Sequence, residues 1–402
     1  MPSLCDEAAA ALDRLTHAGL RRTLRTVETA QGSVVSVHGR EVVNFSSNDY
    51  LGLASCEAVK QAFIEGIERF GAGAGASRLV CGNQPPHEEL EATLASFKGT
   101  EAALAFSSGY ATALGVIPAL VGESDVVILD KLCHASLIDA AKLSGATLRI
   151  FPHNHLEKLE RLLASIREKS AHTRVLIVTE SIFSMDGDAA LLREIVDIKE
   201  RFGAWLLLDE AHAIGLLGPQ GRGLAAELRV ADRIELQMGT LGKAIGVSGG
   251  YVACSRPVRD LLVNKARSFI YSTAPPPATA WAARAAVELA AGHEGDALRA
   301  RLAHGKTVLL QGIPFGLHHA AAIVPLLVGD ENEAMQASAR LLEAGFLIPA
   351  IRYPTVARGA ARLRLTLSAA HEAVQIERLV ARLGDCVPQL FAATQPPLQE
   401  RA

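Results

Sequence analysis

The sequence predicts an α/β fold with a large, mostly parallel central sheet and a smaller α+β domain towards the C-terminal end. Two observations support this prediction. Short apolar runs such as those at 126–129 and 175–178 are continuous rather than alternating, as expected for strands that are buried on both faces. Amphipathic stretches of helical length separate these runs, which is the pattern of repeated β–α–β units.

The expected strands follow one another through the middle of the chain. They span residues 102–106, 125–130, 147–151, 174–180, 205–209, 236–239 and 250–254. Helical patterns at 155–170 and 190–202 lie between them. Gly203 suits the C-terminal end of the second helix, because glycine readily adopts the left-handed conformation that often ends helices.

The last third of the chain changes character. Residues 278–312 predict one long alanine-rich helix or two shorter ones. A strand at 322–328, a helix at 331–344 and a strand at 362–367 then predict a small α+β unit. We therefore expect three parts: an N-terminal arm and helix at 1–55, a large α/β domain at 56–280 and a C-terminal α+β domain at 281–402.

Charge and composition exclude several classes of protein. The 402 residues carry 40 Lys and Arg against 43 Asp and Glu, so the net charge is −3, and a protein that coats nucleic acid or an anionic membrane is not expected. The six cysteines form no CxxC pair, so neither a disulfide framework nor a structural metal site is predicted. Asp6 and Glu7 stand where a secretory signal would be basic and then apolar, and the uncharged span 102–122 contains serine, glycine and proline. We expect a cytoplasmic protein with no membrane partner.

Two motifs resemble those of other enzyme classes. The run from Trp205 to His212 looks like the acidic strand of a DEAH-type ATPase, but the nearest phosphate-loop match, which ends in Gly305-Lys306-Thr307, lacks its first glycine and follows the acidic strand. Gly246-Val-Ser-Gly-Gly250 matches the G-x-S-x-G of serine hydrolases. Its predicted strand follows the motif, whereas the nucleophile of such enzymes comes after a strand and before a helix. We reject both interpretations.

Residues that suit cofactor chemistry follow the ends of successive predicted strands, where open α/β sheets bind their ligands. Gly109 follows one strand and begins a helical stretch, where free N–H groups can bind an anion. His134 comes just after the next strand. Asp209 ends another strand, and His212 lies three residues beyond it. Lys243 follows a further strand among glycine and alanine residues, which favours partial desolvation and a lowered pKa.

Together these residues predict a site for pyridoxal 5′-phosphate (PLP). This aldehyde cofactor needs a lysine, its ring nitrogen needs an acid, and its phosphate needs a helix N-terminus. Lys243 and Asp209 suit the first two tasks, and their separation of 34 positions leaves room for one helix and one strand.

Longer motifs in a fixed order extend this prediction. They are Asn44 to Leu53, Gly73 to Gly82, Asp130 to Ser136, Thr179 to Asp188, Leu208 to His212, Gly239 to Lys243, Tyr271 to Thr273, Ile351 to Val356, and Arg362 to Arg364. On these motifs the chain resembles the α-oxoamine synthases, PLP enzymes of aminotransferase-like fold, from about Leu20 to Arg382.

The resemblance implies roles around the cofactor ring. Lys243 would hold the cofactor and remove the α-proton of a bound amino acid. Asp209 would pair with the pyridine nitrogen, and His134 would stack on the ring. His212 and Ser184 would hydrogen-bond the phenolic oxygen and its surroundings.

The resemblance also implies how the phosphate is bound. Gly109, Tyr110 and Thr240 would hold it from the same chain. Thr273 would reach it from a neighbouring subunit, so that a homodimer would be needed to complete the site.

The substrates implied by the resemblance are L-alanine and a pimeloyl thioester, which would condense with loss of CO₂ and a free thiol. The thioester would be carried by coenzyme A or by acyl carrier protein, and family members that use glycine are the alternative. The implied substrate-binding residues are Asn48, His134, Thr355, one of Arg21 and Arg22, and one of Arg362 and Arg364. Alternation along a strand places Arg362 and Arg364 on the same face, so both fit the carboxylate of the amino acid.

Overall fold

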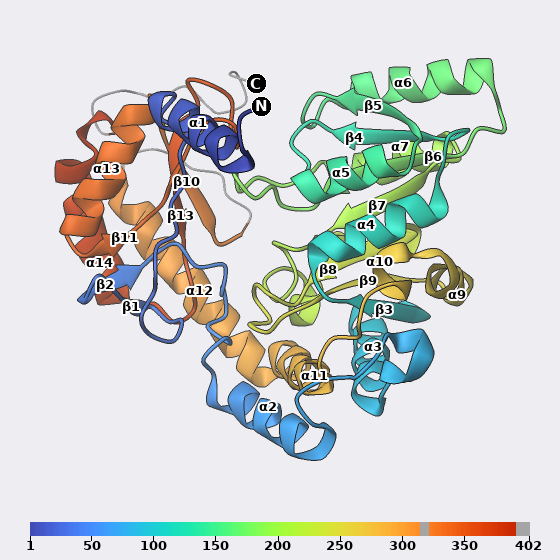
Figure 1. The fold of residues 1–402 in the computed structure, drawn as a ribbon, viewed down its shortest axis with the longest axis horizontal. Coiled ribbons are helices and arrows are strands. Elements are labelled where there is room, and N and C mark those ends of the chain that lie inside the picture. Colours follow the sequence, from blue (N-terminus) through green and yellow to red (C-terminus); the bar gives the residue numbers. More distant parts are fainter. Residues whose placement is uncertain (314–320, 391–402) are drawn as a thin grey trace.

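The computed structural model describes residues 1–313 and 321–390. Figure 1 shows two main bodies, with a large sheet and its helices on the right and a smaller sheet with long helices on the left. The predicted C-terminal domain includes residues 314–320 and 391–402, which lie outside the described residues, and the division at 55 and 280 stays a prediction. No helix in the described ranges is both long and apolar enough to cross a membrane.

The large sheet has seven strands in the order β3-β9-β8-β7-β6-β4-β5 within the described residues. They are β3 (Ala102–Phe106), β4 (Val126–Asp130), β5 (Thr147–Phe151), β6 (Val175–Glu180), β7 (Trp205–Asp209), β8 (Leu236–Thr240) and β9 (Gly250–Cys254). Among these strands, β9 alone runs in the direction opposite to the other six. The predicted strands and the mostly parallel sheet are therefore confirmed.

Both faces of this sheet are covered, which explains the continuous apolar runs. The helices on one face are α4 (Gly109–Leu120), α5 (Ala135–Leu143), α9 (Arg256–Lys265) and α10 (Arg267–Ile270). Those on the other face are α6 (Leu156–Lys169), α7 (Leu192–Arg201) and α8 (Leu224–Glu227). Val127 and Leu129 of β4 pack in one hydrophobic cluster with residues of α4 and α5, whereas Ile128 between them packs in another cluster with residues of α6 and α7.

The alanine-rich stretch forms two helices rather than one. They are α11 (Pro277–Ala291) and α12 (His293–Gly312), with a break at Gly292, whose backbone is extended. Helix α11 packs against α2 (Glu57–Phe70) and α3 (Pro85–Lys98). A Cβ atom at Gly66 of α2 would lie 2.8 Å from the Cα of Ala278, so glycine permits this close packing.

The smaller sheet has the order β10-β13-β12, with β10 at Ile323–Gly329, β13 at Ala361–Thr366 and β12 at Ala350–Ile351. Helices α13 (Glu331–Glu343) and α14 (Ala373–Cys386) lie beside it. The expected strands and helix of this region are confirmed to within two residues at each end.

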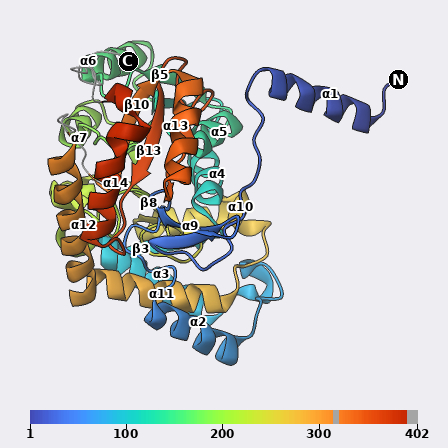
Figure 2. The same ribbon diagram turned by 90° about the vertical axis from the view of Figure 1, so that its left-hand side faces the viewer.

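The N-terminal region contains a hairpin that the sequence analysis missed. Strands β1 (Val34–Val37) and β2 (Arg40–Asn44) pair antiparallel, and β2 also pairs in parallel with β11 (Phe346–Leu347). Helix α1 (Leu4–His17) has no buried residue and projects from the rest of the chain (Figure 2).

Candidate active site

The predicted chemistry-bearing residues gather at one edge of the large sheet. Asp209 ends β7, and Glu180 ends the adjacent β6 in register with it. His134 follows β4 as the N-cap of α5, and Lys243 lies in the turn after β8. Because β4, β6, β7 and β8 are parallel, their carboxyl ends bring these side chains together.

Lys243 lies half-buried in a tight turn. Its carbonyl accepts a hydrogen bond from the Gly246 N–H at 2.8 Å, and Gly246 has φ +72°. A Cβ atom there would lie 2.4 Å from the Ala54 nitrogen, so the turn requires glycine. Burial disfavours the ammonium form and lowers the pKa of Lys243, although the charges of Asp209 and Glu180 oppose this effect.

A chain of hydrogen bonds connects Lys243 to the C-terminal region. The Nζ atom of Lys243 lies 2.8 Å from Nε2 of His212, and Nδ1 of His212 lies 2.6 Å from the Tyr50 hydroxyl. The Tyr50 hydroxyl donates to Oδ1 of Asn48 at 3.2 Å, and Nη2 of Arg364 donates to the same oxygen at 3.1 Å. Burial, followed by the charge of Lys243, lowers the pKa of His212 well below its usual value, so this imidazole is neutral.

Two buried carboxyl groups lie beside the lysine. Oδ1 of Asp209 accepts the Ala211 N–H at 2.9 Å, and no cationic side chain in the described ranges forms an ion pair with it. Burial raises the pKa of Asp209, and Lys243 opposes this effect. The Glu180 carboxylate accepts the backbone N–H of His134. Burial and the charge of Asp209 raise the pKa of Glu180 well above its usual value.

His134 offers an open ring face. Nδ1 lies 2.8 Å from Oγ of Ser136, and the residue is exposed in the single chain. Partial desolvation and then the charge of Lys243 lower the pKa of His134, which favours the neutral form. A neutral ring whose Nδ1 is held by the hydroxyl and the backbone N–H of Ser136 suits stacking on a flat ligand.

The N-terminal end of α4, where we expect the phosphate, lies beside Thr240. Gly109 is the first residue of the helix, and a Cβ atom there would lie 3.6 Å from Cβ of Thr240, so the two residues are neighbours. A Cβ atom at Gly250 would lie 2.5 Å from the Gly109 nitrogen, so β9 approaches the helix end closely. Tyr110 is exposed and donates from its hydroxyl to Asp139. The predicted phosphate-binding residues of this chain therefore lie together.

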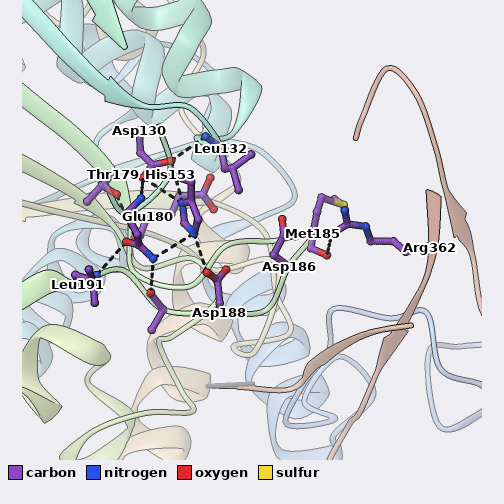
Figure 3. Close-up of polar contacts among 12 residues, drawn as sticks. Asp130, Leu132, His153, Thr179, Glu180, Met185, Asp186, Asp188, Leu191 and Arg362 are labelled. Carbon is purple, nitrogen blue, oxygen red and sulfur yellow. Dashed lines mark hydrogen bonds and ion pairs between the residues drawn. The ribbon is translucent and has the colours of Figure 1, made fainter. Parts of the chain in front are cut away.

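Arg362 and Arg364 both point from β13 towards the turn at residues 184–186, as alternation predicts. Arg362 forms an ion pair with Asp186 and donates to the Met185 carbonyl at 3.2 Å (Figure 3). Arg364 donates to the Ser184 carbonyl at 2.7 Å. In contrast to Arg362, the other acceptors of Arg364 are neutral side-chain oxygens, namely those of Thr366 and Asn48.

The remaining predicted residues form no hydrogen bond with Lys243 in the described part of the chain. Nη2 of Arg22 lies 3.5 Å from Oγ1 of Thr355, whereas Nη1 of Arg21 lies 3.5 Å from Oγ1 of Thr16. The structure thus brings Arg22, rather than Arg21, to Thr355. Thr273 is exposed and forms an isolated bridge with Ser77, and no hydrogen bond in the described part of the chain joins it to the start of α4.

These residues fit PLP. The lysine has a lowered pKa, a buried carboxylate beside it can pair with a ring nitrogen, and a neutral imidazole offers a flat face. The start of α4 lies next to Thr240 and can take a phosphate. Lys243, Asp209, His134 and Gly109 would therefore hold the group at four different points.

Comparison with known proteins agrees with this fit. The family "Aminotransferase class I and II" matches residues 40–383. The chain belongs to this family. A curated relative from Geobacter sulfurreducens, named 8-amino-7-oxononanoate synthase, is 52% identical over 380 residues, which are 94% of this chain and 96% of that protein. Another 8-amino-7-oxononanoate synthase, from an Anaeromyxobacter species, is 48% identical and covers 98% of both chains.

Solved structures of family members have the same fold. A serine palmitoyltransferase from Sphingomonas wittichii has a TM-score of 0.90 and 29% identity, covering 97% of this chain and 99% of that chain. A serine palmitoyltransferase variant with PLP has a TM-score of 0.89 and 28% identity, covering 96% and 98%. An 8-amino-7-oxononanoate synthase from Francisella tularensis has a TM-score of 0.74 and 27% identity, covering 87% and 99%. The predicted family, fold and cofactor are confirmed, and the chain is a PLP-dependent enzyme.

The sequence analysis gave no role to two residues that the structure brings to the site. Tyr50 lies in the motif at 44–53, but nothing in the sequence shows that its hydroxyl reaches His212. Glu180 ends an apolar strand next to the strand of Asp209, and a charged residue at that place is a signal that could have been used.

Proposed function

We propose that this chain condenses L-alanine with a pimeloyl thioester to give 8-amino-7-oxononanoate, CO₂ and a free thiol, which is a step of biotin biosynthesis. Curated relatives that share about half of the residues carry this enzyme name. The observation that supports the proposal most directly is the half-buried Lys243, whose Nζ lies 2.8 Å from a neutral imidazole.

When bound, PLP supplies an aldehyde that joins to an amine and a ring that takes up the electron pair released at the amino-acid Cα. Lys243 holds this group and, as a free amine, takes the α-proton at Nζ. Its lowered pKa favours the neutral amine, which is the form that accepts a proton. Asp209 would keep a proton on the ring nitrogen, and His134 would cover one face of the ring.

The other contacts would fix the orientation of the cofactor. His212 and Ser184 would bind the phenolic oxygen and its surroundings. Gly109, Tyr110 and Thr240 would bind the phosphate at the N-terminus of α4. Thr273 of a second subunit would complete the phosphate site, in which case the active form would be a homodimer.

Arg364 is our choice for the carboxylate of L-alanine. Arg362 already forms an ion pair with Asp186, whereas the guanidinium of Arg364 contacts neutral acceptors. The charge of Arg364 also helps to lower the pKa of both Lys243 and His212. Asn48 accepts from Arg364 and lies beside the reacting groups. The positive charge of Arg364 is therefore available to a substrate carboxylate.

Arg22 and Thr355 form the entrance for the acyl donor. The distance of 3.5 Å between them brings together two segments that are far apart in the sequence. A guanidinium and a hydroxyl at this place suit the polar groups of coenzyme A or of acyl carrier protein.

The test is a product assay with the purified, PLP-loaded protein. It receives pimeloyl-CoA, or pimeloyl-acyl carrier protein, together with L-alanine, glycine or L-serine. We expect the mass of 8-amino-7-oxononanoate and release of CO₂ with L-alanine. Absence of product with both donors, or a higher kcat/KM with glycine or L-serine, would contradict the proposal.

A further inference from the structure

His153 lies between two carboxylates outside the residues discussed so far (Figure 3). It follows β5 and precedes α6. Its Nδ1 lies 3.1 and 3.2 Å from the two oxygens of Asp130, and its Nε2 lies 2.7 Å from Oδ2 of Asp188. The rings of His153 and Phe183 lie edge to face, with ring centroids 4.3 Å apart. The imidazole thus joins two acidic residues that belong to different turns.

Asp130 organises the turn that carries His134. Its Oδ1 accepts the Leu132 N–H at 2.9 Å, its Oδ2 accepts the Asn154 N–H at 3.2 Å, and its carbonyl accepts the Cys133 N–H at 3.1 Å. The side chain is fully buried. The position of His134 in the site therefore depends on the position of the Asp130 carboxylate.

Asp188 organises the turn on the opposite side. Its carbonyl accepts the Phe183 N–H at 3.0 Å and closes the turn at residues 183–188. The same turn presents the Ser184 carbonyl to Arg364 and the Asp186 carboxylate to Arg362. A displacement of this turn would move Arg364.

The environment of His153 favours the imidazolium. Burial alone would lower its pKa, but hydrogen bonds and charges from Asp130 and Asp188 outweigh burial and raise the pKa to about 10. These two carboxylates are the charged groups that contact the ring in the described part of the chain. Both ring nitrogens can therefore donate, one to each carboxylate. The Asn154 amide nitrogen also lies 3.2 Å from Nε2, and it has another acceptor in the Ala189 carbonyl at 3.1 Å.

We propose that His153 is a positioning residue. As a cation held between Asp130 and Asp188, it fixes the turn of Ser184 relative to the turn of His134 and thereby places Arg364 for the substrate carboxylate. No atom of His153 needs to touch the substrate. This inference rests on the proposed function for the role of Arg364.

The first test compares H153Q with H172Q. His172 is an exposed histidine in the turn before β6, so its replacement is a matched control. L-Alanine is titrated into each PLP-loaded protein without an acyl donor, and the change in cofactor absorbance gives a Kd. We expect H153Q to raise this Kd by on the order of tenfold or more, since a charged hydrogen-bond pair is lost, and H172Q to leave it unchanged. A merely structural histidine would reduce the amount of folded protein but not the affinity of each folded site.

A second variant and a spectroscopic measurement cover the case in which H153Q does not fold. D188N removes the carboxylate on the partly exposed side of His153, and it should raise the same Kd for L-alanine. In ¹⁵N-histidine-labelled protein, both ring nitrogens of His153 should remain protonated at pH 8. A neutral His153 ring at pH 8, or an unchanged Kd for L-alanine in folded H153Q or D188N, overturns the inference.

The outcomes separate this inference from the proposed function. If the unaltered protein binds L-alanine but forms no product with either pimeloyl donor, the proposed reaction fails while the effect of H153Q on the Kd still supports His153. If product forms and the Kd of H153Q is unchanged, only the inference about His153 fails. If the unaltered protein does not bind L-alanine, both are wrong.

Discussion

The Nζ atom of Lys243 lies 2.8 Å from Nε2 of His212, and this pair is the start of a hydrogen-bond chain that ends at Arg364. The neutral imidazole accepts from the lysine at Nε2 and donates from Nδ1 to the Tyr50 hydroxyl, which donates to Asn48 in turn. Burial raises the pKa of Tyr50 to about 12, so the phenol keeps its proton. The residue that we assign to proton transfer and the residue that we assign to the carboxylate are thus physically connected.

Tyr50 gives the first prediction. Y50F removes the hydroxyl that lies 2.6 Å from Nδ1 of His212 but keeps the buried ring. We expect kcat to fall about tenfold, because a buried imidazole N–H is left unsatisfied and His212 is less firmly held beside Lys243. The thermal midpoint should fall modestly, because an unsatisfied buried donor costs about 1–3 kcal/mol of the free energy of unfolding. Steady-state kinetics with L-alanine check this expectation. An unchanged kcat would show that catalysis does not depend on the hydrogen bond between Tyr50 and His212.

The two arginines of β13 give the second prediction. R364Q should raise the KM for L-alanine by about 100-fold, since a charged hydrogen bond to the substrate carboxylate is lost. R362Q should raise it by less than about tenfold, because Arg362 already pairs with Asp186. The same assay applied to both variants decides between them. A larger effect of R362Q would assign the carboxylate to Arg362 instead.

The buried ion pair between Lys98 and Glu210 gives a prediction about stability. Both side chains are almost completely buried, and Oε1 of Glu210 also accepts the Ala225 N–H at 3.0 Å. K98M leaves this carboxylate without its partner, so the free energy of unfolding should fall by about 3–5 kcal/mol.

An exposed pair provides the control for this variant. Lys60 and Glu57 form an ion pair with both side chains more than half exposed, so K60M should cost at most about 1 kcal/mol. Urea unfolding of both variants measures the difference. Equal losses in the free energy of unfolding for K98M and K60M would show that burial does not make the ion pair of Lys98 and Glu210 more important for stability.

His371 predicts how stability depends on pH. Its Nδ1 accepts the Ser368 N–H at 2.9 Å, its Nε2 donates to the Asn44 carbonyl at 3.1 Å, and its ring stacks on Phe45. Burial lowers its pKa to about 4. Below pH 6.5 the unfolded chain binds a proton that the folded chain does not, so stability is lost as the pH falls from 6.5 towards 4, by up to about 3 kcal/mol.

H371Q isolates this contribution. Burial raises the pKa of Asp49 to about 6, so protonation of Asp49 in the folded chain adds stability as the pH falls through the same range. The contribution of His371 is therefore measured as the difference between H371Q and the unaltered protein. The thermal midpoint of H371Q should fall less between pH 6.5 and pH 4.5 than that of the unaltered protein. Parallel curves for the two proteins would show that His371 does not titrate in this range.

Much of the site could be predicted because of one geometric rule. Lys243, Asp209 and His134 follow the ends of parallel strands, and these ends meet at one edge of the sheet. The apolar runs before them are long enough to be read as buried strands. Local sequence therefore contains the information that places these three residues.

Other parts of the site depend on contacts between distant segments, which local patterns do not contain. Tyr50 reaches His212 across 162 positions in the sequence, and Arg362 is distinguished from Arg364 by its pairing with Asp186, 176 positions away. The β1–β2 hairpin was missed for a related reason. Its strands are short, and besides β1 the strand β2 pairs with the two-residue strand β11 near the other end of the chain.

The central claim, that Lys243 holds PLP for this reaction, is tested most directly by borohydride reduction of the PLP-loaded protein followed by peptide mass spectrometry. Borohydride makes the bond between a lysine and an aldehyde permanent. We predict the cofactor mass on the peptide that contains Lys243, and no labelled peptide and no condensation activity in K243A. A cofactor mass on another lysine, or full activity of K243A, would contradict the account.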